Sequence, residues 1–280
     1  MGAIRGMSDN NHRRAWWGIG LAGGGLTVLT LVVLLAVALV PRAPETVEAV
    51  LARTGYDLTA ARGGTPVPAV FIAHLPRDLA EVGQPEARKD AFLQLLLPLV
   101  LRENGRLRGL RDRIRNRPAA IRAAVFERYG VAAGDSQTLL RRVDVIPPSL
   151  ALAQAAIESG WGTSRFAREA NNLFGQRIYG RAAKGVAPAG VDKAPFKLRA
   201  FGDIGASVRA YMHNINTHPA YADLRRARAA LRLRGGQLTG SALAHALTRY
   251  SERKAAYVQQ VRQIMRQNRL LEFDTARLRS

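Results

Sequence analysis

A short apolar helix that ends in a single carboxylate is the feature that most restricts how this chain can fold. Its start is predicted at Pro147–Pro148, because proline is tolerated in the first turn of a helix. The residues Ala151–Ala156 are almost all alanine or leucine, so this helix can pack closely inside a mainly helical core. Gly160 and Gly162 predict that the helix stops directly after Glu158. The pattern therefore predicts a lone acid at the exit of a buried helix.

Glu158 has the surroundings expected of a general acid. Cleavage of a glycosidic bond requires a carboxylic acid that stays protonated until it gives its proton to the leaving oxygen. The C-terminal end of a helix carries partial negative charge, and the apolar neighbours Ile157 and Trp161 exclude water, so both effects favour the protonated carboxyl. A glutamate alone at a helix end is most often a solvated surface residue, and the motif around Glu158 is what favours catalysis.

Five side chains that follow Glu158 in the sequence are candidates for holding a sugar. An indole ring can stack on a sugar face, amides can form hydrogen bonds with acetamido groups, and a tyrosine can present its hydroxyl to a cleft. Each type also has a structural interpretation, since aromatic rings pack in cores and asparagines form turns and helix caps. The candidate substrate-binding residues are Trp161, Asn171, Asn172, Phe174 and Tyr211.

These residues lie in stretches that resemble the Bax-type glucosaminidases, part of the wider glycoside hydrolase family 73 with its flagellar FlgJ-like muramidases and Gram-positive autolysins. The ESGWG run that begins at Glu158 and the NNLFG run that begins at Asn171 form a specific combination at this spacing. The matching stretches are Ala153–Gln176, Ser207–Arg225 and Tyr250–Met265, and with the helical stretch ahead of the site the resemblance covers roughly Val67–Asn268.

The resemblance implies a lysozyme-like, mainly α fold with a small irregular or β lobe. It implies peptidoglycan as the substrate, cut at the β-1,4 bond after N-acetylglucosamine. In this resemblance Glu158 matches the general acid, and Tyr221 matches the tyrosine that helps to position substrate in the cleft. Asn172 and Phe174 match the wall of the site.

The second catalytic group is left open by the sequence. Many members of the family place another acid in the small lobe, where Asp192 is the nearest candidate in this chain. Asp203 is expected to cap a helix instead. Without a second acid, the N-acetyl group of the substrate can attack the anomeric carbon. Retention and inversion of configuration therefore both stay open.

The N-terminal stretch Trp16–Val40 carries no charge and is long enough to cross a bilayer as a helix. Arginines precede it, so the leader is expected in the cytoplasm and the remainder outside. Ala36–Ala38 resembles a cleavage site, but the apolar run exceeds the roughly 7–15 residues of a signal peptide. We therefore expect a single-pass anchor in the bacterial cytoplasmic membrane, with the catalytic domain on the periplasmic side.

The expected organisation begins with this anchor and continues through a helical region with the strongest periodicity at Pro85–Arg115. The later stretch 175–198 is rich in glycine, alanine, proline and lysine, which is typical of a small non-helical lobe. In order, the segments are a leader (1–15), a transmembrane signal-anchor (16–40), a linker (41–64), a helical N-terminal extension (65–142), a glucosaminidase catalytic domain (143–270) and a tail (271–280).

Composition narrows the alternatives. The net charge of +21 suits an anionic partner such as cell-wall polymer or a membrane surface. The basic residues are spread over several helices without a nucleic-acid motif, so no specific nucleic acid is expected. The chain has no cysteine, and its five histidines lack metal-ligand spacing, so no metal or cofactor is expected. A lytic transglycosylase-like muramidase and a catalytically silent cell-wall-binding module stay open as alternatives, and the sequence does not predict an oligomeric state.

Overall fold

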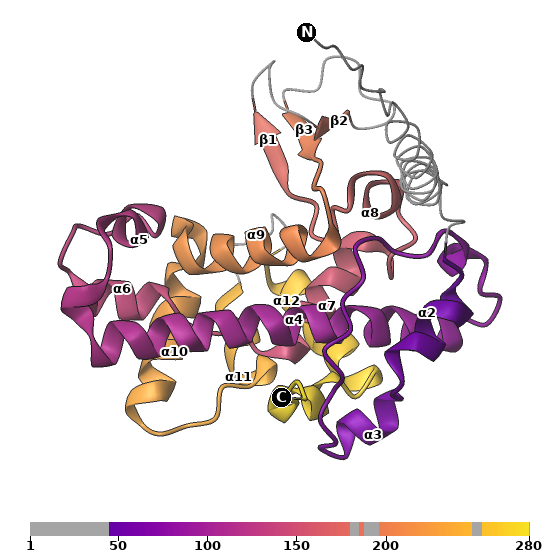
Figure 1. The fold of residues 1–280 in the computed structure, drawn as a ribbon, viewed down its shortest axis with the longest axis horizontal. Coiled ribbons are helices and arrows are strands. Elements are labelled where there is room, and N and C mark those ends of the chain that lie inside the picture. Colours follow the sequence, from indigo (N-terminus) through magenta and orange to yellow (C-terminus); the bar gives the residue numbers. More distant parts are fainter. Residues whose placement is uncertain (1–44, 180–184, 188–195, 248–253, 280) are drawn as a thin grey trace, which may run out of the picture. The chain divides into compact units, whose positions relative to one another are not determined.

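The computed structural model describes residues 45–179, 185–187, 196–247 and 254–279 (Figure 1). These residues belong to one compact unit, Glu45–Ser280. The predicted membrane anchor Trp16–Val40 and the candidate acid Asp192 lie outside the described residues. Within the part of the chain that is described, no helix combines the length and the apolar character needed to cross a bilayer.

The described residues are mainly α-helical with one small sheet, as the sequence predicted. The α-helices are α2 (Val47–Thr54), α3 (Leu58–Arg62), α4 (Pro85–Asn116), α5 (Ala123–Arg128), α6 (Ser136–Arg142), α7 (Pro148–Ser159), α8 (Arg165–Ala170), α9 (Ile204–Thr217), α10 (Ala222–Leu233), α11 (Gly240–Ala244) and α12 (Lys254–Gln267). Short 3-10 helices are η1 (Arg77–Glu81), η2 (Pro118–Ala120), η3 (Pro219–Tyr221), η4 (His245–Leu247) and η5 (Leu270–Thr275). The strands are β1 (Arg177–Tyr179), β2 (Gly185–Val186) and β3 (Phe196–Arg199).

The helix α4 forms a long central element on which α2, α3, α6, α7 and α9 pack. It continues through Pro98 as one helix of 32 residues, and its side chains from Leu95 to Leu101 are buried. The helices α7 and α9 both pack against it, as Figure 1 shows. The expected N-terminal extension 65–142 and the expected catalytic domain 143–270 therefore share one hydrophobic core. The boundary between them stays a prediction from the sequence.

The helix α7 lies in the middle of this core, as its composition predicted. Its residues from Ser149 to Ala156 are at most 1% exposed. The helix ends at Ser159, and Gly160 follows in the left-handed conformation at φ 58°, where a residue with a side chain is disfavoured. The site at its C-terminal end is thus carried by a rigid, fully packed element.

The two ends of the described unit meet each other. The segment 45–64, which we expected to be a linker, folds into α2 and α3, and both pack on α4. Val67 forms a parallel bridge with Leu278, near the C-terminus. Leu270 and Phe273 of η5 are fully buried, and η5 packs on α7. The C-terminal η5 therefore supports the helix that carries Glu158 directly, and α3 packs on η5 in turn.

A three-stranded antiparallel sheet forms the small lobe that the sequence predicted. The strand order is β1-β3-β2. Tyr179 of β1 pairs with Phe196 of β3, and Arg177 pairs with Leu198. The helix α8 packs on β2 and β3, so the lobe stands on the segment that follows α7 (Figure 1).

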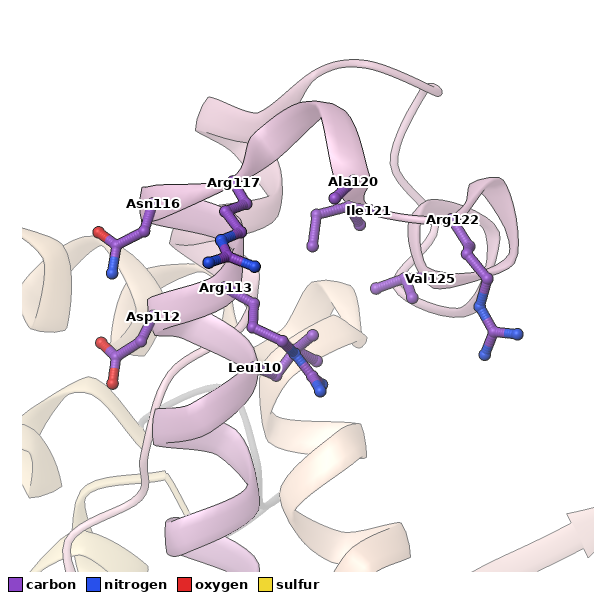
Figure 2. A pocket seen from close by; sticks show the side chains of 9 residues that line it. All are labelled: Leu110, Asp112, Arg113, Asn116, Arg117, Ala120, Ile121, Arg122 and Val125. Carbon is purple, nitrogen blue, oxygen red and sulfur yellow. The ribbon is translucent and has the colours of Figure 1, made fainter.

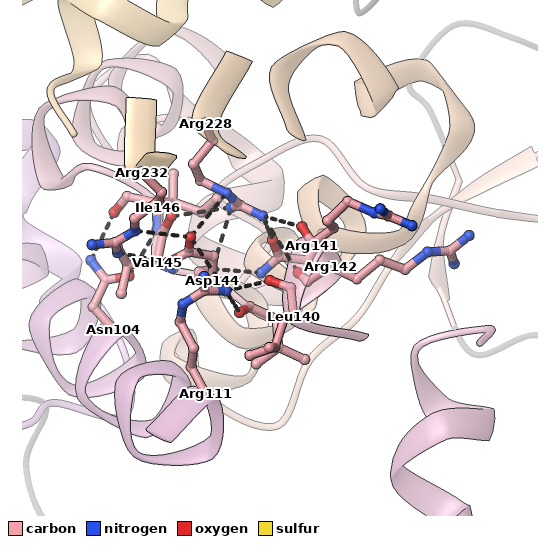
Figure 3. A network of polar contacts seen from close by, with 12 residues as sticks. Asn104, Arg111, Leu140, Arg141, Arg142, Asp144, Val145, Ile146, Arg228 and Arg232 are labelled. Carbon is pink, nitrogen blue, oxygen red and sulfur yellow. Dashed lines mark hydrogen bonds and ion pairs between the residues drawn. The ribbon is translucent and has the colours of Figure 1, made fainter. Parts of the chain in front are cut away.

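A buried ion-pair network fixes the loop that leads into α7 (Figure 3). Asp144 is 2% exposed, and its carboxylate lies 2.8 Å from Arg232, 3.6 Å from Arg111 and 3.7 Å from Arg228. Arg228 is also fully buried and donates to the carbonyl of Val145 at 3.1 Å. Because Arg111 belongs to α4 and the other two arginines to α10, this network ties both helices to the start of α7.

Candidate active site

Glu158 is the penultimate residue of α7 and is half-buried. Burial raises the pKa of its carboxyl, while a hydrogen bond from Tyr257 and the charge of Arg177 lower the pKa in part. The net shift is upward, which is the direction that the sequence predicted. A carboxyl with this shift keeps its proton at a higher pH than an exposed glutamate does, which suits a proton donor.

A chain of hydrogen bonds from the core ends at Glu158. The Tyr257 hydroxyl donates to Glu158 Oε1 at 3.1 Å, and the Gln154 amide donates to the Tyr257 hydroxyl at 2.9 Å. The Tyr211 hydroxyl in turn donates to Gln154 Oε1 at 2.6 Å. Tyr211 thus orients Gln154, Gln154 orients Tyr257, and Tyr257 orients the Glu158 carboxyl.

Tyr257 is a site residue that the sequence analysis did not single out. It lies within the matching stretch Tyr250–Met265. Its spacing there is that of a buried helix residue, so the sequence did not distinguish it from a core tyrosine. The contact pairs it with a residue 99 positions away. The available signal was Gln154, a polar side chain placed four residues before Glu158 on the same helix face.

Phe174 and Tyr211, both candidates for sugar binding, are buried and stack on each other. Their rings stack at 3.9 Å with an interplanar angle of 9°, and they are 3% and 2% exposed. This stack orients the tyrosine hydroxyl toward Gln154. After Phe174, the backbone turns at Gly175, where an added Cβ would lie 3.5 Å from Glu158 Oε2.

Asn171 and Asn172 join α8 to the small lobe. Asn171 is the C-cap of α8 at φ 52°, and its amide donates to the Phe201 carbonyl at 2.9 Å. The Asn172 amide donates to the carbonyls of Gln176 and Arg199, both at 2.9 Å. Both side chains are buried and form hydrogen bonds within the protein, so their turn-forming role is observed, and sugar binding stays a prediction.

Trp161 lies in the tight turn directly after Glu158. Its backbone has a positive φ of 59°. The half-buried indole packs edge-on to Phe92 of α4 at 6.0 Å and lies 5.8 Å from the Lys89 ammonium. A Cβ added to the next residue, Gly162, would lie 2.9 Å from Phe92. This turn therefore packs so closely on the core that it has no room for a side chain at Gly162. Part of the indole stays at the surface beside the acid.

Tyr221 and Asp203 belong to the elements that follow the small sheet, and the role of Tyr221 in positioning substrate stays a prediction. Tyr221 closes η3 and is 1% exposed, with its ring 6.4 Å from that of His218. The tyrosine hydroxyl that contacts Glu158 belongs to Tyr257. Asp203 accepts a hydrogen bond from Ala206 N at 2.6 Å and caps α9, as predicted. Within the described ranges, no group of three or more histidines and acids could hold a metal ion.

A cavity of about 490 Å³ lies elsewhere, at the C-terminal end of α4 (Figure 2). Its apolar part comes from α4 and from the segment leading into α5, and Arg113, Arg117 and Arg122 contribute positive charge. None of the candidate site residues lines it. Chemistry, and not cavity size, therefore identifies the region around Glu158 as the candidate site.

Comparison with known proteins shows that part of the chain matches a family of glucosaminidases. Residues 134–270 match the glucosaminidase family, described as mannosyl-glycoprotein endo-beta-N-acetylglucosaminidase, and this range includes Glu158, Tyr257 and the small sheet. No solved structure matches the chain.

One relative identifies the group of glucosaminidases to which the chain is similar. Over 199 residues the chain is 36% identical to Protein bax of Escherichia coli (strain K12), covering 64% of this chain and 69% of that protein. The chain belongs to the Bax-type glucosaminidase family.

Proposed function

We propose that this protein is a peptidoglycan hydrolase that cleaves the β-1,4 bond after N-acetylglucosamine, with Glu158 as the general acid. The observation that carries the proposal is the half-buried carboxyl of Glu158, with its raised pKa, beside the small lobe. Membership of the glucosaminidase family supports a glycan as the substrate. The mainly helical fold with its small sheet fits a lysozyme-like architecture, as the resemblance implied.

In the proposed reaction, Glu158 protonates the leaving glycosidic oxygen while positive charge builds on the sugar ring. Glu158 Oε1 accepts the hydrogen bond from Tyr257, which leaves Oε2, beside Gly175, as the oxygen that delivers the proton. The absence of a side chain at Gly175 gives the substrate room at this oxygen. An acid of the lobe, for which Asp192 is the candidate, or the N-acetyl group of the substrate then assists at the anomeric carbon, and water completes the hydrolysis. Water attacks directly if the acid acts as a base, and it opens the intermediate if the acid or the N-acetyl group attacks first. The first proton transfer, from Glu158 to the leaving oxygen, is the same in each case.

We further propose that Trp16–Val40 anchors the protein in the cytoplasmic membrane and leaves the catalytic unit in the periplasm. The uncharged run of this segment and the arginines before it support this placement. The net charge of +21 then favours contact with anionic wall polymers. Extraction of membranes at alkaline pH tests the anchor: an integral protein stays in the pellet, and release into the supernatant would contradict it.

Mass spectrometry of digested peptidoglycan tests the activity. The full chain in detergent is incubated with purified sacculi, with and without borohydride reduction, beside the Glu158→Gln variant. Fragments that end in reducible N-acetylglucosamine, absent with the variant, are expected. Anhydro-muramyl ends would instead identify a lytic transglycosylase, and binding to sacculi without any fragments would identify a silent wall-binding module.

A further inference from the structure

One face of the small sheet carries a positive and aromatic surface that the acid alone does not explain. Residues two apart on a strand share a face, and directly paired residues of neighbouring strands do so as well. Arg177 and Tyr179 of β1 therefore lie on the same face as Phe196 of β3, which pairs with Tyr179. We call these three residues the lobe platform.

The side chains of the lobe platform contact one another in a row. The Arg177 guanidinium carbon lies 4.3 Å from the centroid of the Phe196 ring, and the Tyr179 ring packs edge-on to Phe196 at 6.4 Å and 61°. Stacking on an aromatic ring holds a guanidinium in a fixed plane and leaves its N–H groups directed outward. Arg177 is exposed, so these donors are accessible to a ligand.

Tyr179 is the exposed end of the row. Its side chain is 69% exposed, among the few large hydrophobic residues in the described ranges that reach the surface in this way. An exposed aromatic ring beside a half-buried one presents a flat apolar face with a polar hydroxyl at its edge. That is the shape and chemistry that a pyranose ring requires for stacking.

The lobe platform begins at the acid. Gly175 approaches Glu158 Oε2, and Arg177 follows it by two residues at the start of β1. The positive charge of Arg177 acts on the Glu158 carboxyl and lowers its pKa in part, so the two groups are electrostatic neighbours. A glycan bound at Glu158 therefore meets Arg177 first and Tyr179 further along the lobe.

We propose that Arg177, Phe196 and Tyr179 form a glycan subsite on the leaving-group side of Glu158, where Tyr179 stacks on a sugar ring and Arg177 pairs with a carboxylate of the glycan. The leaving sugar keeps the oxygen that Glu158 protonates, and the proposal places this sugar over the lobe residues that follow Gly175. The inference rests on the proposed function, because the carboxylates it needs are those of peptidoglycan, the proposed substrate. These belong either to the lactyl group of N-acetylmuramic acid or to the peptide stems.

This subsite gives the enzyme a means to choose between the two alternating β-1,4 bonds of peptidoglycan. Cleavage after N-acetylglucosamine makes N-acetylmuramic acid the leaving sugar. A planar guanidinium that binds its carboxylate by two parallel hydrogen bonds would place that sugar, and not its neighbour, at the acid. Arg177 is then a specificity residue, and Tyr179 supplies affinity that does not depend on charge.

Binding measurements in the inactive Glu158→Gln background test the subsite. Calorimetric titration of the full chain in detergent uses three probes: chitotetraose, a peptide-free tetrasaccharide of alternating N-acetylglucosamine and N-acetylmuramic acid, and the same tetrasaccharide with peptide stems. We expect a charged tetrasaccharide to bind about tenfold more tightly than chitotetraose, the effect of one charge-assisted pair. Preference for the peptide-free form identifies the lactyl carboxylate, and preference for the peptide-bearing form identifies the stems.

Two variants separate the roles within the lobe platform. Arg177→Gln is expected to bring the ratio between charged and neutral probes close to one. Tyr179→Ala is expected to weaken all probes by a similar factor, about fivefold to tenfold, through the loss of stacking. Arg199→Gln is the matched control, because its guanidinium lies on the opposite face of β3, over Phe201 at 4.8 Å.

An unchanged ratio in Arg177→Gln would overturn the subsite, as would an equal loss in Arg199→Gln, which would indicate bulk charge attraction only. Absence of binding to all three probes would overturn it too. Circular dichroism of each variant confirms that it is folded. The digestion of sacculi is a separate readout: if no fragments form while Arg177→Gln still abolishes the binding ratio, the proposed function fails and the subsite stands.

Discussion

A carboxyl lies at each end of α7, and the pKa values of the two are shifted in opposite directions. Asp144 precedes the helix and is surrounded by the guanidinium groups of Arg111, Arg228 and Arg232 (Figure 3). Glu158 lies at the other end, with a hydrogen bond from Tyr257 and the charge of Arg177. Burial raises the pKa of both groups, but the arginines outweigh it at Asp144 and the net pKa is lowered there.

Asp274 shows that hydrogen bonds from neutral groups do not lower the pKa of a buried carboxyl as the arginines do at Asp144. Its carboxylate accepts bonds from Ser149 N at 2.9 Å, from the Ser149 hydroxyl at 2.8 Å and from Gly240 N at 2.9 Å. Burial nevertheless raises its pKa, and these neutral donors lower it only in part. The comparison teaches that neighbouring positive charges decide the direction in which the pKa of these carboxyls is shifted.

Replacing the acid is expected to have the largest effect. Glu158→Gln keeps the size of the side chain and removes its proton, so hydrolysis of peptidoglycan should fall about a thousandfold. Release of reducing ends measures the loss. Glu169→Gln, an exposed glutamate of α8, is the matched control and should keep full activity. Full activity in Glu158→Gln would remove the basis of the proposed mechanism.

Replacing the ionised carboxylate should affect stability instead. Asp144→Asn leaves three guanidiniums without their counter-charge, one of them fully buried, and should lower the free energy of unfolding by about 3 kcal/mol. Urea denaturation measures this loss. Asp223→Asn, which breaks the surface pair with Arg226, should cost less than about 1 kcal/mol. Equal losses in both variants would show that the Asp144 network does not stabilise the fold as a buried cluster.

Loss of the Tyr257 hydroxyl should alter both the rate and its pH dependence. Its hydrogen bond lowers the pKa of Glu158, so Tyr257→Phe should raise that pKa. Because the acid is active when protonated, the alkaline limb of the pH–rate profile should move to higher pH. We also expect a loss of about tenfold in rate from looser positioning of the acid. A limb that moved to lower pH would contradict the assigned contact, and Tyr129→Phe provides a control away from the site.

The smallest expected effect is a difference in the pH dependence of stability. The raised pKa of Glu158 contributes stability that is complete below its unfolded pKa and is lost as pH rises through its folded pKa. The lowered pKa of Asp144 contributes stability above its unfolded pKa, which is lost as pH falls through its folded pKa. Relative to the unmodified protein, Glu158→Gln should therefore gain stability with rising pH and Asp144→Asn should lose it. Urea midpoints over a pH series test this, and slopes of equal sign would refute it.

The sequence predicted the elements whose causes are local. The start of α7 follows from its prolines, its end from Gly160, and the cap of α9 from Asp203, because each depends on neighbours within one turn. The apolar helix composition and the irregular stretch after Gly175 were likewise enough to predict a mainly helical unit with a small lobe. Each of these features depends on residues that are close together in the sequence.

The contacts that make the site were not predictable in this way. Tyr257 reaches Glu158 across 99 positions, and helical periodicity does not distinguish it from other core tyrosines. Asn172 and Phe174 have side chains that suit either a ligand or a turn, and only the structure shows which contacts they make within the protein. Nor does a chain with 42 lysines and arginines reveal which three of them converge on Asp144.

The hydrogen-bond chain behind Glu158 runs in a single direction, from Tyr211 through Gln154 and Tyr257 to the carboxyl oxygen. When Glu158 gives up its proton, negative charge appears at the receiving end of a row of dipoles that already point toward it. No group in the row has to rotate to stabilise the new charge. These dipoles are oriented when the protein folds, so the free-energy cost of orienting them does not add to the barrier of proton transfer.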